Sequence, residues 1–198
     1  MNAPLVWMLL SFALVALAYV RRSAGVFGKH ADGRLSWVHT LVLAPYHLLS
    51  HLAAYLASSA TPYHEVAPGL YLGRRLGGRA ARRAVAELEL AAVLDLTAEF
   101  AEPVAFRRLD YLNLPLLDKT APTAAQLQAG VDFLKEHHGM GRPVYVHCAL
   151  GHGRSATFVL AYLGKSEEWL QQIRPGVGLT PEQKKLLQAI QPGPQGPG

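Results

Sequence analysis

The chain has 198 residues, 51% of them hydrophobic, which suits one domain of common size plus an appended segment and excludes a second full domain. Its net charge of +5 favours an anionic surface or substrate, but no aromatic-rich RNA-binding pattern accompanies the arginines, so no nucleic acid is expected. Cys148 is the only cysteine, so the thiol is either a buried apolar group or a reactive group suited to a reducing compartment.

Residues 3–20 contain no charged side chain. A helix rises about 1.5 Å per residue and needs about 20 apolar residues to cross a hydrocarbon core of about 30 Å. Arg21 and Arg22 follow, and with Lys29 and Arg34 they form a positive flank that predicts a retained anchor. A cleaved signal peptide is the alternative, because residues 16–18 read Ala-Leu-Ala, but no basic region precedes the apolar run.

A second apolar segment, about 35–60, also lacks acidic and basic side chains other than histidine. It is either a second span or a re-entrant or interfacial segment. Basic residues lie on both sides of it, and the positive-inside tendency places both flanks in the cytoplasm, which favours the interfacial form. His47 and His51 have metal-ligand spacing, but no third ligand is near, so metal is not expected. Residues 1–63 are therefore predicted to be a membrane anchor, with the domain that follows in the cytoplasm.

The remaining chain predicts an α/β domain over residues 64–190. Strand patterns alternate with helical patterns, and Thr123 with Gln126 forms a capping box before an apolar helix face. Expected strands cover 70–72, 93–96, 109–116 and 144–146, and expected helices cover 79–90, 123–137, 155–163, 166–173 and a segment from 180. The result is a small central sheet flanked by helices, and the Pro- and Gly-rich residues 191–198 are expected to be disordered.

The stretch that carries the chemistry is His147-Cys148-Ala149-Leu150-Gly151-His152-Gly153-Arg154-Ser155, between a predicted strand and a predicted helix. Backbone amides of a loop at a helix N-terminus bind phosphoryl oxygens well, and glycines permit a tight path. The expected substrate-binding residues are Ala149, Leu150, Gly151, His152, Gly153 and Arg154.

Each catalytic side chain in this loop has a physical role. Arg154 offers a planar fork of donors to two phosphate oxygens. The helix N-terminus and this cation lower the pKa of the Cys148 thiol, which favours a thiolate nucleophile. His147 is expected to orient the loop, and Ser155 to stabilise the departing thiolate. The alternative is a buried Cys148 beside an incidental glycine turn.

This loop resembles the signature loop of the dual-specificity branch of the protein tyrosine phosphatase superfamily. The resemblance extends over about residues 64–190, with weaker landmarks at 69–73, 93–97 and 174–176. It implies hydrolysis through a phosphocysteine intermediate without metal or cofactor. It also implies a general acid about 30 residues before the nucleophile, a position that Asp118 occupies. Asp95 and Asp110 lie in strand-like contexts and are expected to be structural.

The substrate is expected to be either a phosphorylated protein or a phospholipid, with the family average slightly favouring the protein. Residues 118–123 also look like the corresponding loop of the phosphatidylglycerophosphate phosphatases of this family. The signature loop carries Ala149, Leu150 and His152 in place of lysines, which makes a polyphosphoinositide less expected, and the connection after Leu163 is shorter than the family pattern. Two other classes remain open: a catalytically silent phosphate-binding module, and a sulfur-transfer or arsenate-reducing enzyme. Disulfide-cycling reductases need further cysteines, so their absence argues against the second class.

Overall fold

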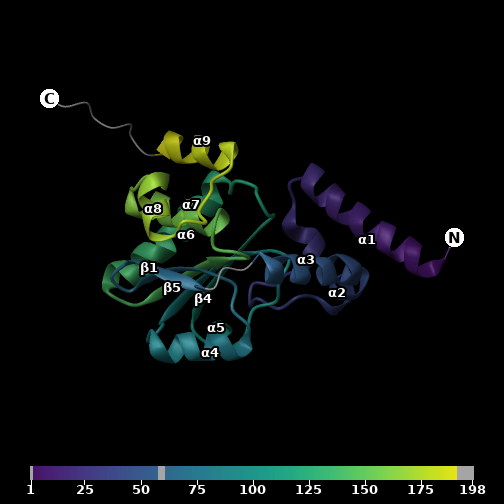
Figure 1. Cartoon of the computed structure of the whole chain (residues 1–198), viewed down its shortest axis with the longest axis horizontal. Helices are drawn as coiled ribbons and strands as arrows, with labels where there is room; N and C mark the ends of the chain where they lie inside the picture. Colours follow the sequence, from purple (N-terminus) through teal and green to yellow (C-terminus); the bar gives the residue numbers. More distant parts are fainter. Residues whose placement is uncertain (1, 58–60, 191–198) are drawn as a thin grey trace.

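The computed structural model describes residues 2–57 and 61–190 and contains one five-stranded sheet in the order β1-β2-β5-β3-β4 (Figure 1). The strands are β1 Tyr63–Ala67, β2 Leu70–Arg74, β3 Ala92–Thr97, β4 Asp110–Leu116 and β5 Val144–Cys148. β1 pairs antiparallel with β2 and all other pairs are parallel. The predicted α/β class and the four predicted strands are confirmed, whereas β1 was not predicted.

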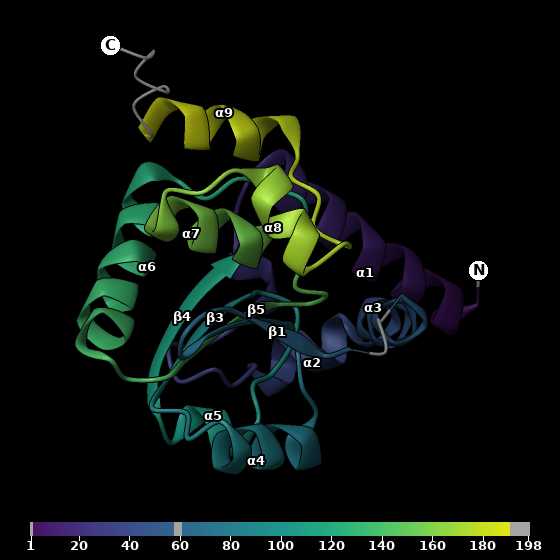
Figure 2. The same ribbon diagram turned by 60° about the vertical axis from the view of Figure 1, so that its left-hand side comes forward.

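Helices cover both faces of this sheet (Figures 1 and 2). One face packs against α6 Ala124–His137, α7 Arg154–Leu163, α8 Glu167–Ile173 and α9 Pro181–Ile190. The other face packs against α4 Gly78–Glu87 and α5 Val104–Arg107. The predicted capping box is confirmed, because the Thr123 hydroxyl accepts from the Gln126 amide and the Gln126 side chain accepts from the Thr123 amide.

The N-terminal segment forms a group of helices at the edge of the sheet where the parallel strands end. It contains α1 Ala3–Val20, the 3₁₀ turn η1 Ala24–Phe27, α2 Trp37–Val42 and α3 Ala44–Leu56. α3 lies against α1, since the Tyr46 amide donates to the Ser11 hydroxyl at 3.4 Å, and the Trp7 indole donates to the Val42 carbonyl at the end of α2 at 3.1 Å. Val15 and Ala18 of α1 are buried in one cluster with Leu117, which follows β4. The N-terminal helices therefore pack on the α/β domain itself.

Within the described residues, α1 is the one helix long and apolar enough to cross a membrane. The second apolar segment breaks at Leu43 into α2 and α3, of 6 and 13 residues, and neither has the length of about 20 residues that spans a bilayer. The end of this segment, 58–60, and the tail expected to be disordered, 191–198, lie outside the described residues.

Exposed large apolar side chains gather on α1, α2 and α3. In the described part of the chain, those outside these helices are Val104, Met140 and Ile190. On α2 and α3 the exposed ones are Trp37, Val38, Leu41, Leu48, Leu49, Leu52, Tyr55 and Leu56, and α1 exposes a similar set. A contiguous apolar surface of this kind normally marks a membrane or partner interface.

Candidate active site

Cys148 is the last residue of β5, the central strand, and α7 begins at Arg154 after a short loop. Parallel strands place ligand-binding loops at their carboxyl ends, because the following helix directs its N-terminal amides there. The Cys148 side chain is 3% exposed. The predicted strand, tight loop and helix around the cysteine are confirmed.

The Cys148 sulfur lies among hydrogen-bond donors and next to a fixed cation. The Gly151 amide donates to Sγ at 3.2 Å and the Ser155 hydroxyl donates to it at 3.3 Å. Burial alone would raise the pKa of the Cys148 thiol, but the charge of Arg154 and hydrogen bonds from Ser155 and the His152 backbone outweigh burial and lower this pKa. The site therefore favours a thiolate at Cys148. These contacts do not fit the alternative of a buried, inert cysteine.

The backbone of the loop is held from outside by Arg174. Gly151 has a φ of +74°, and a Cβ there would lie 2.4 Å from the backbone of Gly73, so glycine is required. Gly153 has a φ of −115° and needs no such freedom, contrary to the expectation that both glycines shape the path. The Arg174 side chain donates to the carbonyls of Leu150 and Gly151, each at 2.9 Å. These bonds hold two loop carbonyls on the Arg174 side, away from the site.

Arg154 is buried and held by an acid that the sequence analysis did not identify. Its two terminal nitrogens donate to the two carboxylate oxygens of Glu99 at 3.0 and 2.7 Å. Nη1 also donates to the Leu116 carbonyl at 2.8 Å. Burial would raise the pKa of Glu99, but the charge of Arg154 outweighs burial and holds this pKa below its usual value. Arg154 Nε is buried and has no hydrogen-bond partner among the described residues. The guanidinium is thus fixed on one side and has a donor left for an anion.

Asp118 lies beside Arg154, as its predicted role requires. One carboxylate oxygen is 3.2 Å from Arg154 Nη2, and the side chain is 54% exposed. Asp118 lines a pocket of about 200 Å³ together with Cys148 and Arg154. The loop that carries it is tethered to α9, because the buried Gln183 side chain donates to the Thr120 carbonyl at 2.9 Å. The tethering role of Gln183 depends on tertiary contact between α9 and this loop, so the sequence gives no signal for it.

His147 is buried one residue before the nucleophile. Its Nδ1 is 3.4 Å from the Cys148 carbonyl, and its Nε2 is 3.4 Å from a carboxylate oxygen of Glu102. Burial lowers the pKa of His147, but Glu102 and Asp95 outweigh burial, so the pKa of this ring is raised. Asp110, at the opposite end of β4, pairs with Arg142 at 2.5 Å. Asp95 and Asp110 therefore have the structural surroundings that the sequence predicts.

One group of metal-ligand type side chains occurs in the described residues: Asp95, Glu102 and His147, with ligand atoms within 4.8 Å of one another. Lys29 already donates to Asp95 at this place. A metal would have to displace that internal cation, so the cluster is poorly suited to one. His51 Nδ1 is 2.7 Å from the His47 carbonyl, a contact within α3.

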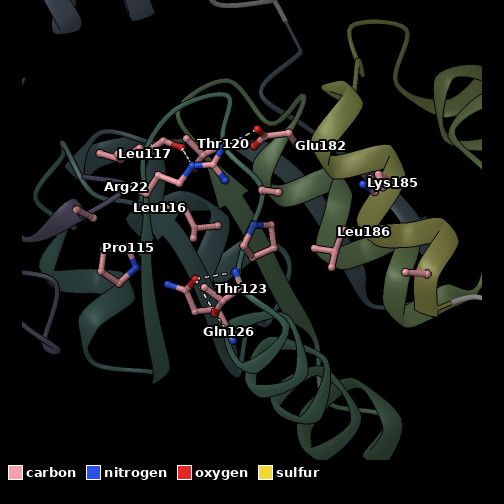
Figure 3. A pocket seen from close by; sticks show the side chains of 14 residues that line it. Arg22, Pro115, Leu116, Leu117, Thr120, Thr123, Gln126, Glu182, Lys185 and Leu186 are labelled. Carbon is pink, nitrogen blue, oxygen red and sulfur yellow. Dashed lines mark hydrogen bonds and ion pairs between the residues drawn. The ribbon is translucent and has the colours of Figure 1, made fainter. Parts of the chain in front are cut away.

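A second, larger groove adjoins the loop of Asp118 (Figure 3). It has a volume of about 550 Å³ and lies between the 115–123 segment, the start of α6, α9 and the end of α1. Its apolar lining includes Leu116, Leu117 and Leu186, and Lys185 lies on its α9 side. Arg22 and Glu182 form an ion pair of 2.8 Å across the groove. The groove therefore connects the surroundings of Asp118 with Arg22, two residues past the end of the apolar helix α1.

A five-stranded α/β fold with a thiol below an anion-binding loop is typical of cysteine-based phosphatases. Residues 70–174 match the family model described as "Dual specificity phosphatase, catalytic domain". This match covers more than half of the chain, so the chain belongs to the dual-specificity phosphatase family.

Curated relatives agree with this assignment. The chain is 30% identical to the human "Phosphatidylglycerophosphatase and protein-tyrosine phosphatase 1" over 142 residues, 63% of this chain and 71% of that protein. The rat protein of the same name is 36% identical over 88 residues, which are 40% of this chain. The match spans about half of that relative, 46% of its length. Rat "Dual specificity protein phosphatase 12" is 38% identical over 133 residues, 60% of this chain and 38% of that protein.

Solved structures give the same result. The crystal structure of PTPMT1 in complex with PI(5)P superposes with a TM-score of 0.60 at 26% identity, over 66% of this chain and 95% of that one. Tk-PTP in the active form superposes with a TM-score of 0.59 at 26% identity, over 67% and 98% of the two chains. The resemblance inferred from the signature loop, including its similarity to phosphatidylglycerophosphate phosphatases, is confirmed.

Proposed function

We propose that this protein hydrolyses phosphomonoesters through a phosphocysteine intermediate. The observation that carries the proposal is the Cys148 sulfur, which accepts hydrogen bonds from an amide and a hydroxyl and lies next to a fixed arginine. A metal or cofactor is not required, because the loop amides and Arg154 supply the positive field that phosphoryl transfer needs.

In the first step, the Cys148 thiolate attacks phosphorus, and the bond between phosphorus and the ester oxygen breaks. Protonated Asp118 gives its proton to the leaving oxygen. In the second step, Asp118 takes a proton from water, the water oxygen bonds to phosphorus, and the S–P bond breaks. The Ser155 hydroxyl, 3.3 Å from Sγ, stabilises the thiolate that leaves. Inorganic phosphate is the second product.

Asp118 changes partners during this cycle. Its carboxylate now pairs with Arg154 Nη2, a nitrogen that a phosphate oxygen would need. A bound phosphate would compete for that nitrogen and free Asp118 for the leaving group. The exposed position of Asp118 on its own loop leaves room for this movement.

Asp118→Asn is expected to lower kcat by roughly 10² to 10⁴-fold for an alkyl phosphate and far less for an aryl phosphate such as p-nitrophenyl phosphate. Only the alkyl oxygen needs protonation to leave. Steady-state kinetics on both substrates measure the difference. Asp132→Asn, an exposed aspartate on α6, is the matched control. Equal losses on both substrates would remove Asp118 from the role of general acid.

We also infer that the N-terminal helices attach the protein to a membrane. The exposed apolar side chains of α1, α2 and α3, followed by Arg21 and Arg22, support this attachment. The short α2 and α3 favour an interfacial or re-entrant second segment. The division into an anchor at 1–63 and a catalytic domain at 64–190 on the cytoplasmic side stays a prediction.

Phosphorylated proteins and phospholipids are the two candidate substrate classes, and the groove beside Asp118 favours the phospholipid. It offers apolar walls for the non-phosphate part of a lipid, next to Arg22 at the end of the apolar helix. A phosphate on a headgroup would then enter the small pocket from the membrane side. The names of the mammalian relatives, which include phosphatidylglycerophosphatase, point the same way.

With the full chain on vesicles, phosphate release from phosphatidylglycerophosphate is expected to exceed release from a phosphotyrosine peptide by at least about tenfold in kcat/KM. Leu186→Gln, in the groove, should lower lipid turnover while leaving aryl phosphate turnover within about twofold. Met140→Gln, an exposed position outside the groove, is the control. Peptide turnover equal to or above lipid turnover would favour the phosphoprotein alternative.

A further inference from the structure

Lys29 lies far before the region that matches the family model, yet its side chain ends inside the catalytic domain. It is 1% exposed. Its ammonium donates to Asp95 Oδ2 at 2.5 Å and to the carbonyl and the hydroxyl of Thr97, each at 2.8 Å. All three donors of the ammonium are used. The prediction that Lys29 belongs to a positive flank at the membrane is wrong, because the Lys29 side chain is buried in the domain.

The backbone on both sides of Lys29 is fixed to the domain. Residues 28–36 form a narrow loop in which Lys29 bridges to Leu35. The Glu102 amide donates to the Gly33 carbonyl at 2.8 Å, and the Asn113 side chain donates to the His30 carbonyl at 3.0 Å. This loop connects α1 to α2, so the same short segment joins the apolar helices to the strands below the active site.

Lys29 is the nearest cation to a buried carboxylate behind the phosphate-binding loop. Asp95 on β3 is the register partner of His147 on β5, and an Asp95 oxygen is 3.9 Å from His147 Nε2. Glu102 is 3.4 Å from the same nitrogen. Burial would raise the pKa of Asp95, but the charges of Lys29 and then of His147 lower it well below its usual range. Burial raises the pKa of Glu102 despite the opposing charge of His147, so Asp95 is the carboxylate that Lys29 compensates. Removal of Lys29 leaves the buried Asp95 carboxylate without its nearest cation.

We propose that Lys29 is a positioning residue of the active site: it neutralises Asp95 behind the phosphate-binding loop and so fixes His147 and, through it, the Cys148 thiolate. The catalytic unit then includes the segment that links it to the apolar helices. This inference rests on the proposed function, since it concerns the same loop. His147 is the connection, because it contacts the Asp95 and Glu102 carboxylates at Nε2 and precedes the nucleophile.

The test is Lys29→Met in the full chain, with the single thiol as the probe. The rate of Cys148 alkylation by iodoacetamide against pH reports the thiolate without any turnover. The charged and titratable groups around this sulfur are Arg154, Asp118, Glu99, His147, His152 and Arg174. All of them remain in the variant. Loss of one nearby positive charge is expected to move the alkylation midpoint up by roughly half to one pH unit.

The same variant is expected to lose at least about tenfold in kcat on an aryl phosphate, because a misplaced loop lowers the rate. Lys29→Met/Asp95→Asn, which removes both charges, should return the alkylation midpoint and kcat toward the unmutated values. Lys135→Met, at an exposed lysine on α6, is the matched control and should change neither.

The outcomes separate a positioning role from a purely structural one. A lower melting temperature with an unchanged alkylation profile and unchanged kcat of the folded protein would overturn the proposal. If Lys29→Met does not fold, recovery of a folded, active double variant supports charge compensation, and failure of the double variant overturns it. Failure of the proposed function is distinct, because then the unmutated protein would not hydrolyse the aryl phosphate at all.

Discussion

Cys148→Ser is expected to abolish hydrolysis of an aryl phosphate, with kcat reduced by at least about 10⁴-fold. The substitution exchanges sulfur for oxygen with little change in shape, but a serine hydroxyl stays protonated under conditions in which this thiol is a thiolate. Arg154 and the loop donors lower the pKa of the Cys148 thiol against the effect of burial. The serine variant therefore has no thiolate to act as the nucleophile.

The measurement is initial-rate kinetics on the full chain with reductant and chelator, together with rapid quenching and mass analysis of the trapped intermediate. Because the chain has one cysteine, an acid-labile phosphate adduct on sulfur can only be on Cys148. This adduct should be absent in Cys148→Ser. Ser58→Ala, a position distant in sequence from the signature loop, controls for the handling of a single substitution. Residual activity within about tenfold of the unmutated protein would contradict the phosphocysteine route.

The core of this site could be predicted because it is contiguous in sequence. Cys148 and Arg154 stand six positions apart on one strand-loop-helix unit, and local geometry brings them to one anion. Asp118 needed the family pattern, because nothing local ties a loop aspartate to a distant loop. The structure brings it 3.2 Å from Arg154.

The supporting residues could not be predicted in this way, because each acts through the tertiary fold. Glu99 follows β3, and it accepts hydrogen bonds from Arg154 because β3 and β5 are neighbours in the sheet. Arg174 reaches the loop carbonyls from beyond α8. An acidic residue two positions after a buried strand is a usable signal for Glu99. For Lys29 the signal was misleading, since hydropathy assigns a basic residue near an apolar helix to the membrane flank.

These supports matter because they give Arg154 a direction as well as a charge. Glu99 binds both terminal nitrogens and fixes the plane of the guanidinium, which leaves Nε and the shared Nη2 for phosphate. A lysine ammonium carries the same charge but has no plane and no second nitrogen. Charge and geometry can therefore be separated by one substitution.

Arg154→Lys is expected to lower kcat/KM on an aryl phosphate by roughly 10³-fold, because the paired donors to the transition state are lost. The pH dependence of Cys148 alkylation should move little, since a positive charge remains near the sulfur. Arg83→Lys, at an exposed arginine on α4, is the matched control, and melting curves check that both variants fold. A loss of less than about tenfold would mean that charge alone accounts for the role of Arg154. Parallel shifts in alkylation and turnover would mean that it acts mainly through the thiolate.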